Sequence, residues 1–577
     1  MLLPAPLLSN AFHACRRSFI NAALFSFFIN LAMLVPAIYM LQVYDRVIPS
    51  ANASTLILLT LLMLVFMAAM GILEWARSEL LRRIGNRLDT ACAEVLFETG
   101  YRQVLGSGRR LSGTQPLQDL KAIRQFLATP GIFAFLDTPW IPVYLLVMFA
   151  FHPVMGMIGL ASALLLLGIT WLNERLTAKH QARAEDRHAD AANMAAQYFR
   201  NAEIIASLGM LPPLRQRWYA ANQTALQEQN LAAQPATALA ALSKTLRIVI
   251  QSLILGVGAY LAIEQHITAG MMVAASILLG RTLAPVDQLL GVWKQFITVR
   301  HHYQRLTQVL HEYPPTGNSM PLPAPRGEIR VDIEAVIPPG SDQPVLYDTR
   351  FITAAGTITG IIGPSGAGKS SLARVLLGIW PCAKGSVRLD GVDIHAWNKA
   401  ELGPYLGYLP QDIELFAGTI RENIARFRHE GAEKVIAAAQ LCGLHEFILS
   451  LPAGYDTPIG HDGLTLSGGQ RQRLGLARAV YGLPRVLVLD EPNSNLDHQG
   501  EQALVQVLQH LKHHGSTVFL ITHKMQALAH VDRLLVIDQH TLSMAGPRDA
   551  VLAELNKASQ RVAAAPGIPF PKATVAS

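Results

Sequence analysis

Residues 363–370 of this 577-residue chain read Gly363-Pro364-Ser365-Gly366-Ala367-Gly368-Lys369-Ser370, a match to the phosphate-binding pattern GxxxxGK[ST]. A strand-like run, Thr357–Ile362, precedes the match, and a helix-like run that begins at Ser371 follows it. In this strand–loop–helix context the backbone N–H groups of the loop and the helix N-terminus can face an anion. We therefore predict an α/β nucleotide-binding domain around this loop.

The residue types in the loop suit phosphate chemistry. Glycines let the backbone wrap closely around an anion. We expect the Lys369 ammonium group to reach the β- and γ-phosphates and the Ser370 hydroxyl to bind Mg²⁺. Residues 363–371, including Ser371, form the expected nucleotide-binding loop.

Two carboxylates follow another predicted buried strand. The mainly apolar run Arg485–Leu489 ends in Asp490 and Glu491. Buried parallel strands deliver the residues at their C-terminal ends to the crevice where a nucleotide binds. We expect Asp490 to hold Mg²⁺, directly or through water, and Glu491 to polarise the attacking water.

Between the loop and these carboxylates lies the pentapeptide Leu466-Ser467-Gly468-Gly469-Gln470, directly before a helical run. Ser467 is a natural helix N-cap, and the two glycines allow backbone N–H groups to approach an anion. Over essentially its whole length the chain resembles the ABC ATPase family, whose signature motif is LSGGQ. The resemblance implies a dimer in which the phosphate loop of one copy and the signature motif of the other enclose ATP.

Three further positions match that family. Gln411 corresponds to the glutamine that senses Mg²⁺ and contacts the membrane domain, and His523 to the histidine that contacts the γ-phosphate. Asp497 corresponds to the aspartate that crosses the dimer interface. The resemblance thus implies ATP and Mg²⁺ as cofactors, with Glu491, His523 and Gln411 as catalytic residues and with Ser370, Gln411 and Asp490 at the metal.

One expected residue has no counterpart. ABC domains usually stack adenine on an aromatic side chain upstream of the phosphate loop, but the corresponding region, Ala335–Gly340, contains none. Ile337 lies nearest the expected place. The identity of the bound base is therefore less well predicted than the binding of phosphate.

Long apolar stretches occupy the first half of the chain. The whole chain is 51% hydrophobic and 15% charged, against about 25% charged in an average soluble protein. The apolar stretches fall at about 18–41, 54–75, 130–150, 153–173, 246–263 and 269–291. Each approaches the ~20 residues needed to cross a bilayer, and the first exceeds the apolar core of a cleaved signal peptide. We predict six retained transmembrane helices.

Lys and Arg residues are concentrated in the loops after the second and fourth stretches, whereas the short intervening loops hold almost none beyond Arg46. By the positive-inside rule the N-terminus, both long loops and everything after the sixth stretch are cytoplasmic. These loops also account for the formal net charge of +7, so we expect no nucleic-acid partner.

The predicted fold class is therefore multidomain, with an all-α six-helix transmembrane exporter domain followed by an α/β P-loop ABC ATPase domain. Residues 1–17 are a short cytoplasmic segment and residues 18–305 the transmembrane domain with its two long loops. Residues 306–326 are a Pro-rich linker, residues 327–562 the ATPase domain and residues 563–577 a disordered tail.

The chain carries one membrane domain and one ATPase domain, and in this it resembles exporter half-transporters. Three stretches resemble the PrtD-like type I secretion permease-ATPases, which export proteases, lipases and heme-scavenging proteins: Tyr39–Val47, Asp137–Pro142 and Asp490–Asp497. That resemblance implies a homodimer in the bacterial inner membrane, a periplasmic adaptor, an outer-membrane channel and an unfolded protein cargo with a C-terminal signal. An exporter or flippase of lipids or small amphipathic molecules has the same architecture and remains the alternative.

Two other classes of function fit less well. A soluble ATPase with a helical protein-binding half is disfavoured by the six apolar stretches and by the asymmetry of their loop charges. An ATP-gated channel that hydrolyses poorly is disfavoured by the presence of both Glu491 and His523.

Among the ionisable residues inside the apolar stretches, Asp137, Arg281 and Asp287 stand out. Charge at such positions is costly unless it is paired or hydrated. An ion pair between helices, or a position at a helix end, would account for Arg281 without a role in transport. Alternatively, Arg281 could face a hydrated cavity that receives polypeptide cargo.

Overall fold

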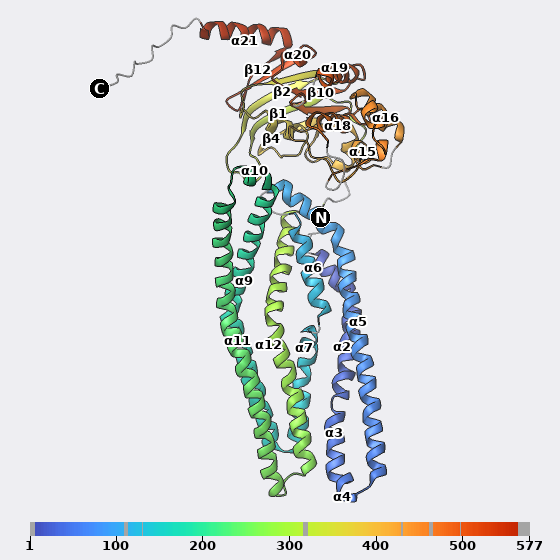
Figure 1. Ribbon diagram of the computed structural model, residues 1–577, viewed down its shortest axis with the longest axis vertical. Coiled ribbons are helices and arrows are strands. Elements are labelled where there is room, and N and C mark those ends of the chain that lie inside the picture. Colours follow the sequence, from blue (N-terminus) through green and yellow to red (C-terminus); the bar gives the residue numbers. More distant parts are fainter. Residues whose placement is uncertain are drawn as a thin grey trace, which may run out of the picture. The chain divides into compact units, whose positions relative to one another are not determined.

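The computed structural model describes residues 6–108, 113–129, 131–315, 321–428, 431–460, 466–494, 496 and 498–563. The chain divides into two compact units, Met1–Gln103 with Ser112–Pro315 and Val104–Leu111 with Thr316–Ser577. The first unit is helical and the second combines helices with a sheet, as predicted (Figure 1). Most of the expected tail, residues 564–577, lies outside the described residues.

The helical unit contains long helices joined by short connections. Its elements are α1 (Pro6–Ala14), α2 (Arg16–Ala32), α3 (Val35–Gln42), a π-helical turn (Val43–Val47), α4 (Ile48–Ser50), α5 (Ala53–Gly106), α6 (Gln115–Ala128), α7 (Gly131–Asp137), a 3-10 turn (Thr138–Trp140), α8 (Ile141–Phe151), α9 (Pro153–Arg200), α10 (Ala202–Ser207), α11 (Leu211–Ile263) and α12 (Ala269–Glu312).

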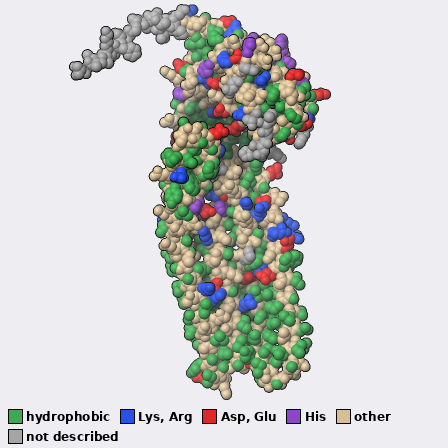
Figure 2. Space-filling view, in the orientation of Figure 1, with side chains coloured by type: hydrophobic (Ala, Val, Ile, Leu, Met, Phe, Trp, Pro, Cys, Tyr) green, Lys and Arg blue, Asp and Glu red, His purple; other side chains and the backbone are tan. Residues whose placement is uncertain are grey.

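Six helical segments among the described residues are long and apolar enough to cross a membrane, which confirms the predicted number of spans. They are Arg16–Ser50, Ala53–Gly106, Gly131–Phe151, Pro153–Arg200, Leu211–Ile263 and Ala269–Glu312. In the view of Figure 2, hydrophobic side chains cover the end of this unit that holds α3 and α4, and Lys and Arg side chains lie farther from that end.

Several helices are much longer than their apolar stretches. α5 has 54 residues and α11 has 53, so each is about 80 Å long at 1.5 Å per residue. α12 also continues through Glu312, into the segment that we expected to be a linker from residue 306. Helical sequence therefore runs well beyond the part of each helix that is apolar enough to lie in lipid.

The third span is interrupted where its prolines lie. α7 ends at Asp137, Pro139 lies in a 3-10 turn, and Pro142 lies in the first turn of α8. Proline lacks an N–H group and clashes with the preceding turn of an α-helix, so a break at this place follows from the sequence.

The last part of the first span is fixed to the start of α12. Asp45, in the π-helical turn, accepts hydrogen bonds from the Thr268 hydroxyl (2.6 Å) and the Gly270 N–H (2.9 Å). A Cβ atom at Gly270 would lie 2.6 Å from the Asp45 carboxylate, so a larger residue there would force the Asp45 side chain to move.

The second unit is organised around a sheet whose strand order is β5-β4-β1-β2-β12-β11-β3-β10-β9-β6. The strands are β1 (Ile329–Val336), β2 (Leu346–Thr353), β3 (Ile358–Ile362), β4 (Lys384–Leu389), β5 (Val392–Asp393), β6 (Leu406–Leu409), β9 (Val486–Asp490), β10 (Thr517–Ile521), β11 (Arg533–Asp538) and β12 (Thr541–Pro547); β7 (Gly418–Thr419) and β8 (Pro458–Ile459) pair separately.

Helices and helical turns connect these strands. They are α13 (Lys369–Leu376), α14 (Lys399–Leu402), a 3-10 turn (Gly403–Tyr405), α15 (Ile420–Ile424), α16 (Ala432–Leu441), α17 (His445–Leu449), a 3-10 turn (Gly454–Asp456), α18 (Gly468–Val480), α19 (His498–His513), α20 (Met525–Leu528) and α21 (Arg548–Ala563).

Four neighbouring parallel strands position the candidate site. β3, β10, β9 and β6 pair in parallel, and every residue of β9 and β10 is buried. Because the carboxyl ends of parallel strands meet at one edge of a sheet, the segments after Ile362, Leu409, Leu489 and Ile521 all emerge at the same edge.

Candidate functional site

The phosphate loop begins directly after β3, and α13 follows it, as the sequence predicts. Gly363 has φ +154°, and a Cβ atom there would lie 2.0 Å from the Ile537 carbonyl oxygen. Gly368, with φ +104°, is the residue directly before α13. Any side chain at Gly363 would collide with β11, and Gly368 occupies the left-handed region that glycine tolerates best.

Lys369 points back into the loop. Its ammonium group donates hydrogen bonds to the carbonyl oxygens of Gly363 and Pro364, each at 2.8 Å. Burial lowers the pKa of Lys369, while the nearby charges of Glu491 and Asp490 act in the opposite direction. The structure thus holds the cation within the curve of the loop and beside both carboxylates.

Ser370 and Asp490 come together from different elements. The Ser370 side chain, on the first turn of α13, lies near enough to the Asp490 carboxylate at the end of β9 to act on its pKa. Asp490 is only 2% exposed, and burial raises its pKa, although the nearby Ser370 side chain opposes that shift. A hydroxyl and a carboxylate are oxygen ligands of the kind that Mg²⁺ takes together with water and substrate phosphate, so this pair fits the expected metal.

The three expected catalytic side chains meet at the Glu491 carboxylate. Gln411 Nε2 donates to one carboxylate oxygen at 3.1 Å, and His523 Nε2 lies 3.8 Å from the other. Gln411 lies two residues beyond β6 and His523 two residues beyond β10, so the shared sheet edge accounts for their proximity.

Glu491 also has an unusual backbone conformation. Its φ is +51°, in the left-handed region that residues other than glycine seldom adopt. Such a conformation costs about 1–3 kcal/mol and persists only where the surroundings hold it in place. The Glu491 N–H donates to the Ile521 carbonyl oxygen at 2.9 Å, which supplies one such constraint from β10.

The signature segment lies at the N-terminus of α18. Ser467 is the N-cap residue, and Ser467 and Gln470 form a reciprocal capping box. The N-cap prediction is therefore confirmed. Within the described part of the chain, no hydrogen bond or ion pair joins Ser467–Gln470 to the phosphate loop of the same chain. Asp497 lies outside the described residues, as does Asn495.

Sequence reasoning missed two polar residues that hold this site together. Gln472 is 2% exposed and bonds the main chain beside Glu491. Arg426 donates to four main-chain carbonyl oxygens, and burial lowers the pKa of Arg426 to about 10. A buried polar residue on the apolar face of α18 was a detectable signal for Gln472; nothing local marks Arg426.

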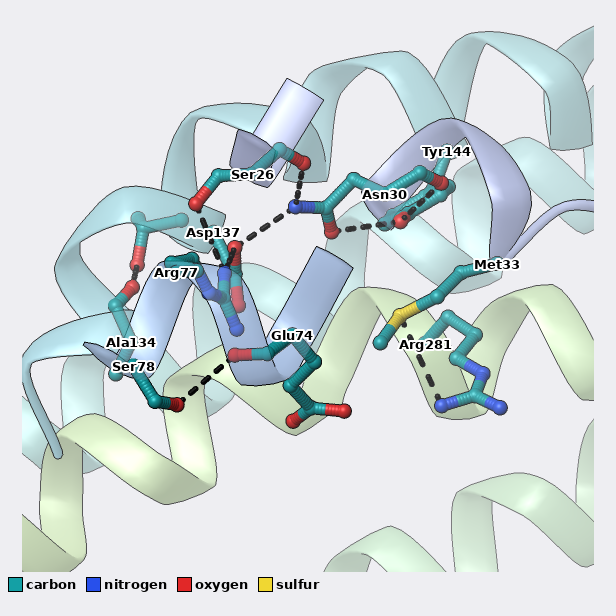
Figure 3. Close-up of polar contacts among 11 residues, drawn as sticks. Ser26, Asn30, Met33, Glu74, Arg77, Ser78, Ala134, Asp137, Tyr144 and Arg281 are labelled. Atoms are coloured by element: carbon teal, nitrogen blue, oxygen red, sulfur yellow. Dashed lines mark hydrogen bonds and ion pairs between the residues drawn. The ribbon is translucent and has the colours of Figure 1, made fainter. Parts of the chain in front are cut away.

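Of Asp137, Arg281 and Asp287, the two aspartates form ion pairs between helices. Asp137 lies 3.0 Å from Arg77, which is 2% exposed, and Asp287 lies 2.7 Å from Arg247. Figure 3 shows the first pair within a buried network that also contains Ser26, Asn30 and Tyr144. These contacts support a structural role for both aspartates.

Arg281 differs from those pairs. The polar contact drawn for it in Figure 3 is with the Met33 sulfur, at 3.8 Å. A thioether is a weak acceptor and cannot neutralise a guanidinium charge. Among the described residues no carboxylate forms an ion pair with Arg281, so the ion-pair explanation does not extend to it.

Comparison with known proteins assigns the two units. A family model described as "ABC transporter transmembrane region" matches residues 19–286, and one described as "ABC transporter" matches residues 346–494. The type I secretion system ATP-binding protein PrsD of Rhizobium meliloti (strain 1021) is 39% identical over 551 residues, which is 95% of each chain. The chain belongs to the type I secretion ABC transporters.

Other comparisons agree with this assignment. The cyclolysin secretion/processing ATP-binding protein CyaB of Bordetella pertussis (strain Tohama I) is 30% identical over 91% of this chain and 74% of its own length. The structure of a bacterial Atm1-family ABC exporter with ATP bound superposes with a TM-score of 0.79 over 96% of this chain and 99% of its own, at 23% identity. This ABC transporter thus has an exporter fold and an ATPase domain that drives transport.

Proposed function

We propose that this type I secretion transporter exports an unfolded protein with a C-terminal signal across the bacterial inner membrane, with ATP hydrolysis as the source of energy. The observation that carries the proposal is the meeting of Gln411, Glu491 and His523 at one carboxylate, on a chain that also holds six membrane spans. The first supplies a hydrolytic site and the second a path across lipid.

In this proposal each residue of the site has a defined role, and Gln411 has two. The phosphate loop binds ATP, and Lys369 neutralises charge on the β- and γ-phosphates. Ser370 and Asp490, with Gln411, hold Mg²⁺, which when bound neutralises further phosphate charge. Glu491 orients the attacking water and accepts its proton, while Gln411 and His523 fix the two oxygens of that carboxylate.

We further propose that the working form is a homodimer. The N-terminus of α18 presents capped backbone N–H groups, yet the described residues show no hydrogen bond or ion pair from it to the phosphate loop of the same chain. In the homodimer, Ser467, Gly468 and Gly469 would contact the phosphates of the ATP that is bound to the phosphate loop of the second copy. Asp497 would cross the interface between the copies.

The orientation and the partners follow from the same assignment. The N-terminus and the ATPase domain face the cytoplasm, and a periplasmic adaptor and an outer-membrane channel complete the route. The relatives are named for type I secretion and for secretion or translocation of cyclolysin and RTX toxins. Those names favour protein cargo over the alternative of lipids or small amphipathic molecules.

A secretion comparison tests the proposal. Culture supernatants of cells without this gene should lack at least one protein that wild-type cells release, by quantitative mass spectrometry. The wild-type gene should restore that protein, whereas a Glu491→Gln gene should not. An unchanged supernatant, together with an altered lipid composition of the envelope, would support the lipid alternative instead.

A further inference from the structure

Gln472 connects the signature helix to the main chain of Glu491. It lies two residues beyond Gln470 on α18 and is 2% exposed. Its side-chain amide donates to the carbonyl oxygen of Pro492 at 3.0 Å and to that of Glu491 at 3.4 Å. One buried side chain therefore joins the helix that carries the signature segment to the strand end that carries the expected base.

The Glu491 main chain needs such support because its φ is +51°. Its N–H donates to the Ile521 carbonyl oxygen of β10, and its own carbonyl oxygen accepts from the Ser494 N–H at 3.2 Å. Of the hydrogen bonds described at this main chain, the one from Gln472 is the one that comes from α18. The position of Glu491 therefore depends on where α18 lies.

We infer that Gln472 is a positioning residue for the hydrolytic reaction. Through its hydrogen bonds, the position of α18 determines the position of the Glu491 carboxylate. The inference rests on the roles proposed for Glu491 and for the second copy. Ser467 and Gln472 are five residues apart, about 7.5 Å along a helix. In the proposed dimer, the α18 N-terminus of each copy contacts the nucleotide on the phosphate loop of the other copy. That nucleotide would thus be linked, through little more than one helical turn of α18, to the Glu491 carboxylate that acts on the second nucleotide.

Two variants of the full-length transporter in lipid nanodiscs test the inference. Gln472→Met keeps the length of the side chain and its apolar packing but removes both donors, and Gln472→Asn keeps the amide but shortens its reach. Gln440→Met makes the same chemical change at an exposed position of α16 and serves as the control. The measurements are kcat and KM for ATP, Kd for the slowly hydrolysed analogue ATPγS, and Tm.

We expect both Gln472 variants to lose at least tenfold in kcat while Kd for ATPγS stays within twofold of wild type, and the control to match wild type. A folded variant that keeps kcat within twofold would overturn the inference. So would an equal, tenfold weakening of ATPγS binding, because that result indicates general damage to the domain.

A double variant separates this inference from the proposed function. In a Glu491→Gln background, adding Gln472→Met should lower the residual hydrolysis no further, since both changes act on the same carboxylate. A further tenfold fall would show that Gln472 acts elsewhere. A different result would contradict the proposed function: cells without the gene would secrete an unchanged set of proteins.

Discussion

The burial of Asp490 lowers the stability of its domain. Asp490 is almost fully buried, and burial raises its pKa above the ordinary range although the nearby Ser370 side chain acts in the opposite direction. A carboxylate whose pKa is raised on folding destabilises the folded state at pH values above that pKa, and the penalty is relieved as the pH falls through it. A neutral side chain of the same shape avoids the penalty at all pH values.

We therefore expect Asp490→Asn to raise Tm in the absence of Mg²⁺ and nucleotide while abolishing Mg²⁺-dependent ATPase activity. A gain of about 1 kcal/mol would raise Tm by about 2–4 °C in a domain of this size. Differential scanning fluorimetry at pH 7.5 measures the shift, with the exposed Asp342→Asn as the control. A lower Tm for Asp490→Asn would contradict this account of its burial.

Among the elements, α18 depends on a residue far away in the sequence. Arg426, just after α15, donates to the carbonyl oxygens of Arg478 and Ala479 in the last turn of α18. It also donates to those of Gly403 and Leu406, which lie before and at the start of β6. A cation at a helix C-terminus is favourable, and here it also joins that terminus to the strand that leads to Gln411.

Arg426→Ala should lower the free energy of unfolding by about 3 kcal/mol, because it leaves several buried carbonyl oxygens without a charged donor. Chemical denaturation of the full-length protein, followed by tryptophan fluorescence, measures the loss. Arg421→Ala removes an exposed ion pair between Arg421, on α15, and Asp456. This change should cost less than about 1 kcal/mol. Equal losses in the two variants would argue against the bridging role.

On α12, Arg281 differs from Asp137 and Asp287, which form ion pairs between helices. The described residues give it no carboxylate partner, and a charge inside a membrane is costly unless it is paired or hydrated. We expect it to face water on the cargo path. Arg281→Gln should then reduce secretion of the cargo protein severalfold without changing basal ATPase activity, and Arg281→Lys should restore part of the secretion. Normal secretion by Arg281→Gln would remove the cargo-path interpretation.

The elements were predictable to different degrees for physical reasons. The phosphate loop and the Ser467 N-cap are local features, so short stretches of sequence predict them. Gln472 and Arg426 were not predicted, because their partners are main-chain carbonyl oxygens that only the fold brings near. The true end of α12 was also missed, since the prediction followed hydrophobicity, whereas the helix continues into polar sequence.

In the whole molecule, one unit has a sequence suited to lipid and the other a sequence suited to water. The long apolar stretches predict six spans, and the phosphate loop with the motifs that follow it predicts one ATPase domain. The dimer cannot be read from composition. It is inferred from the resemblance to ABC ATPases and from an anion-binding helix start that, within the described residues, forms no hydrogen bond or ion pair with the phosphate loop of its own chain.

Glu491→Gln tests the dimer. The variant should bind ATP normally and hydrolyse it at least 10²-fold more slowly, because it lacks the general base. ATP should then hold two ATPase domains together for longer than in the wild type. A single spin label at exposed position 440 reports this closure as a shorter, narrower distance between the two copies. Wild-type turnover, or an ATP-independent distance, would refute the proposed arrangement.

The length of α5 has a mechanical consequence. This helix runs without proline for 54 residues, about 80 Å, and its last residues, Val104–Gly106, already belong to the second unit. A stiff lever of that length amplifies small rotations at its foot. A turn of about 5° near Val104 would carry the far tip through about 7 Å, more than the rise of one helical turn. A small rotation at the foot of α5 therefore produces a large displacement at its tip, with no need for the helix to unwind.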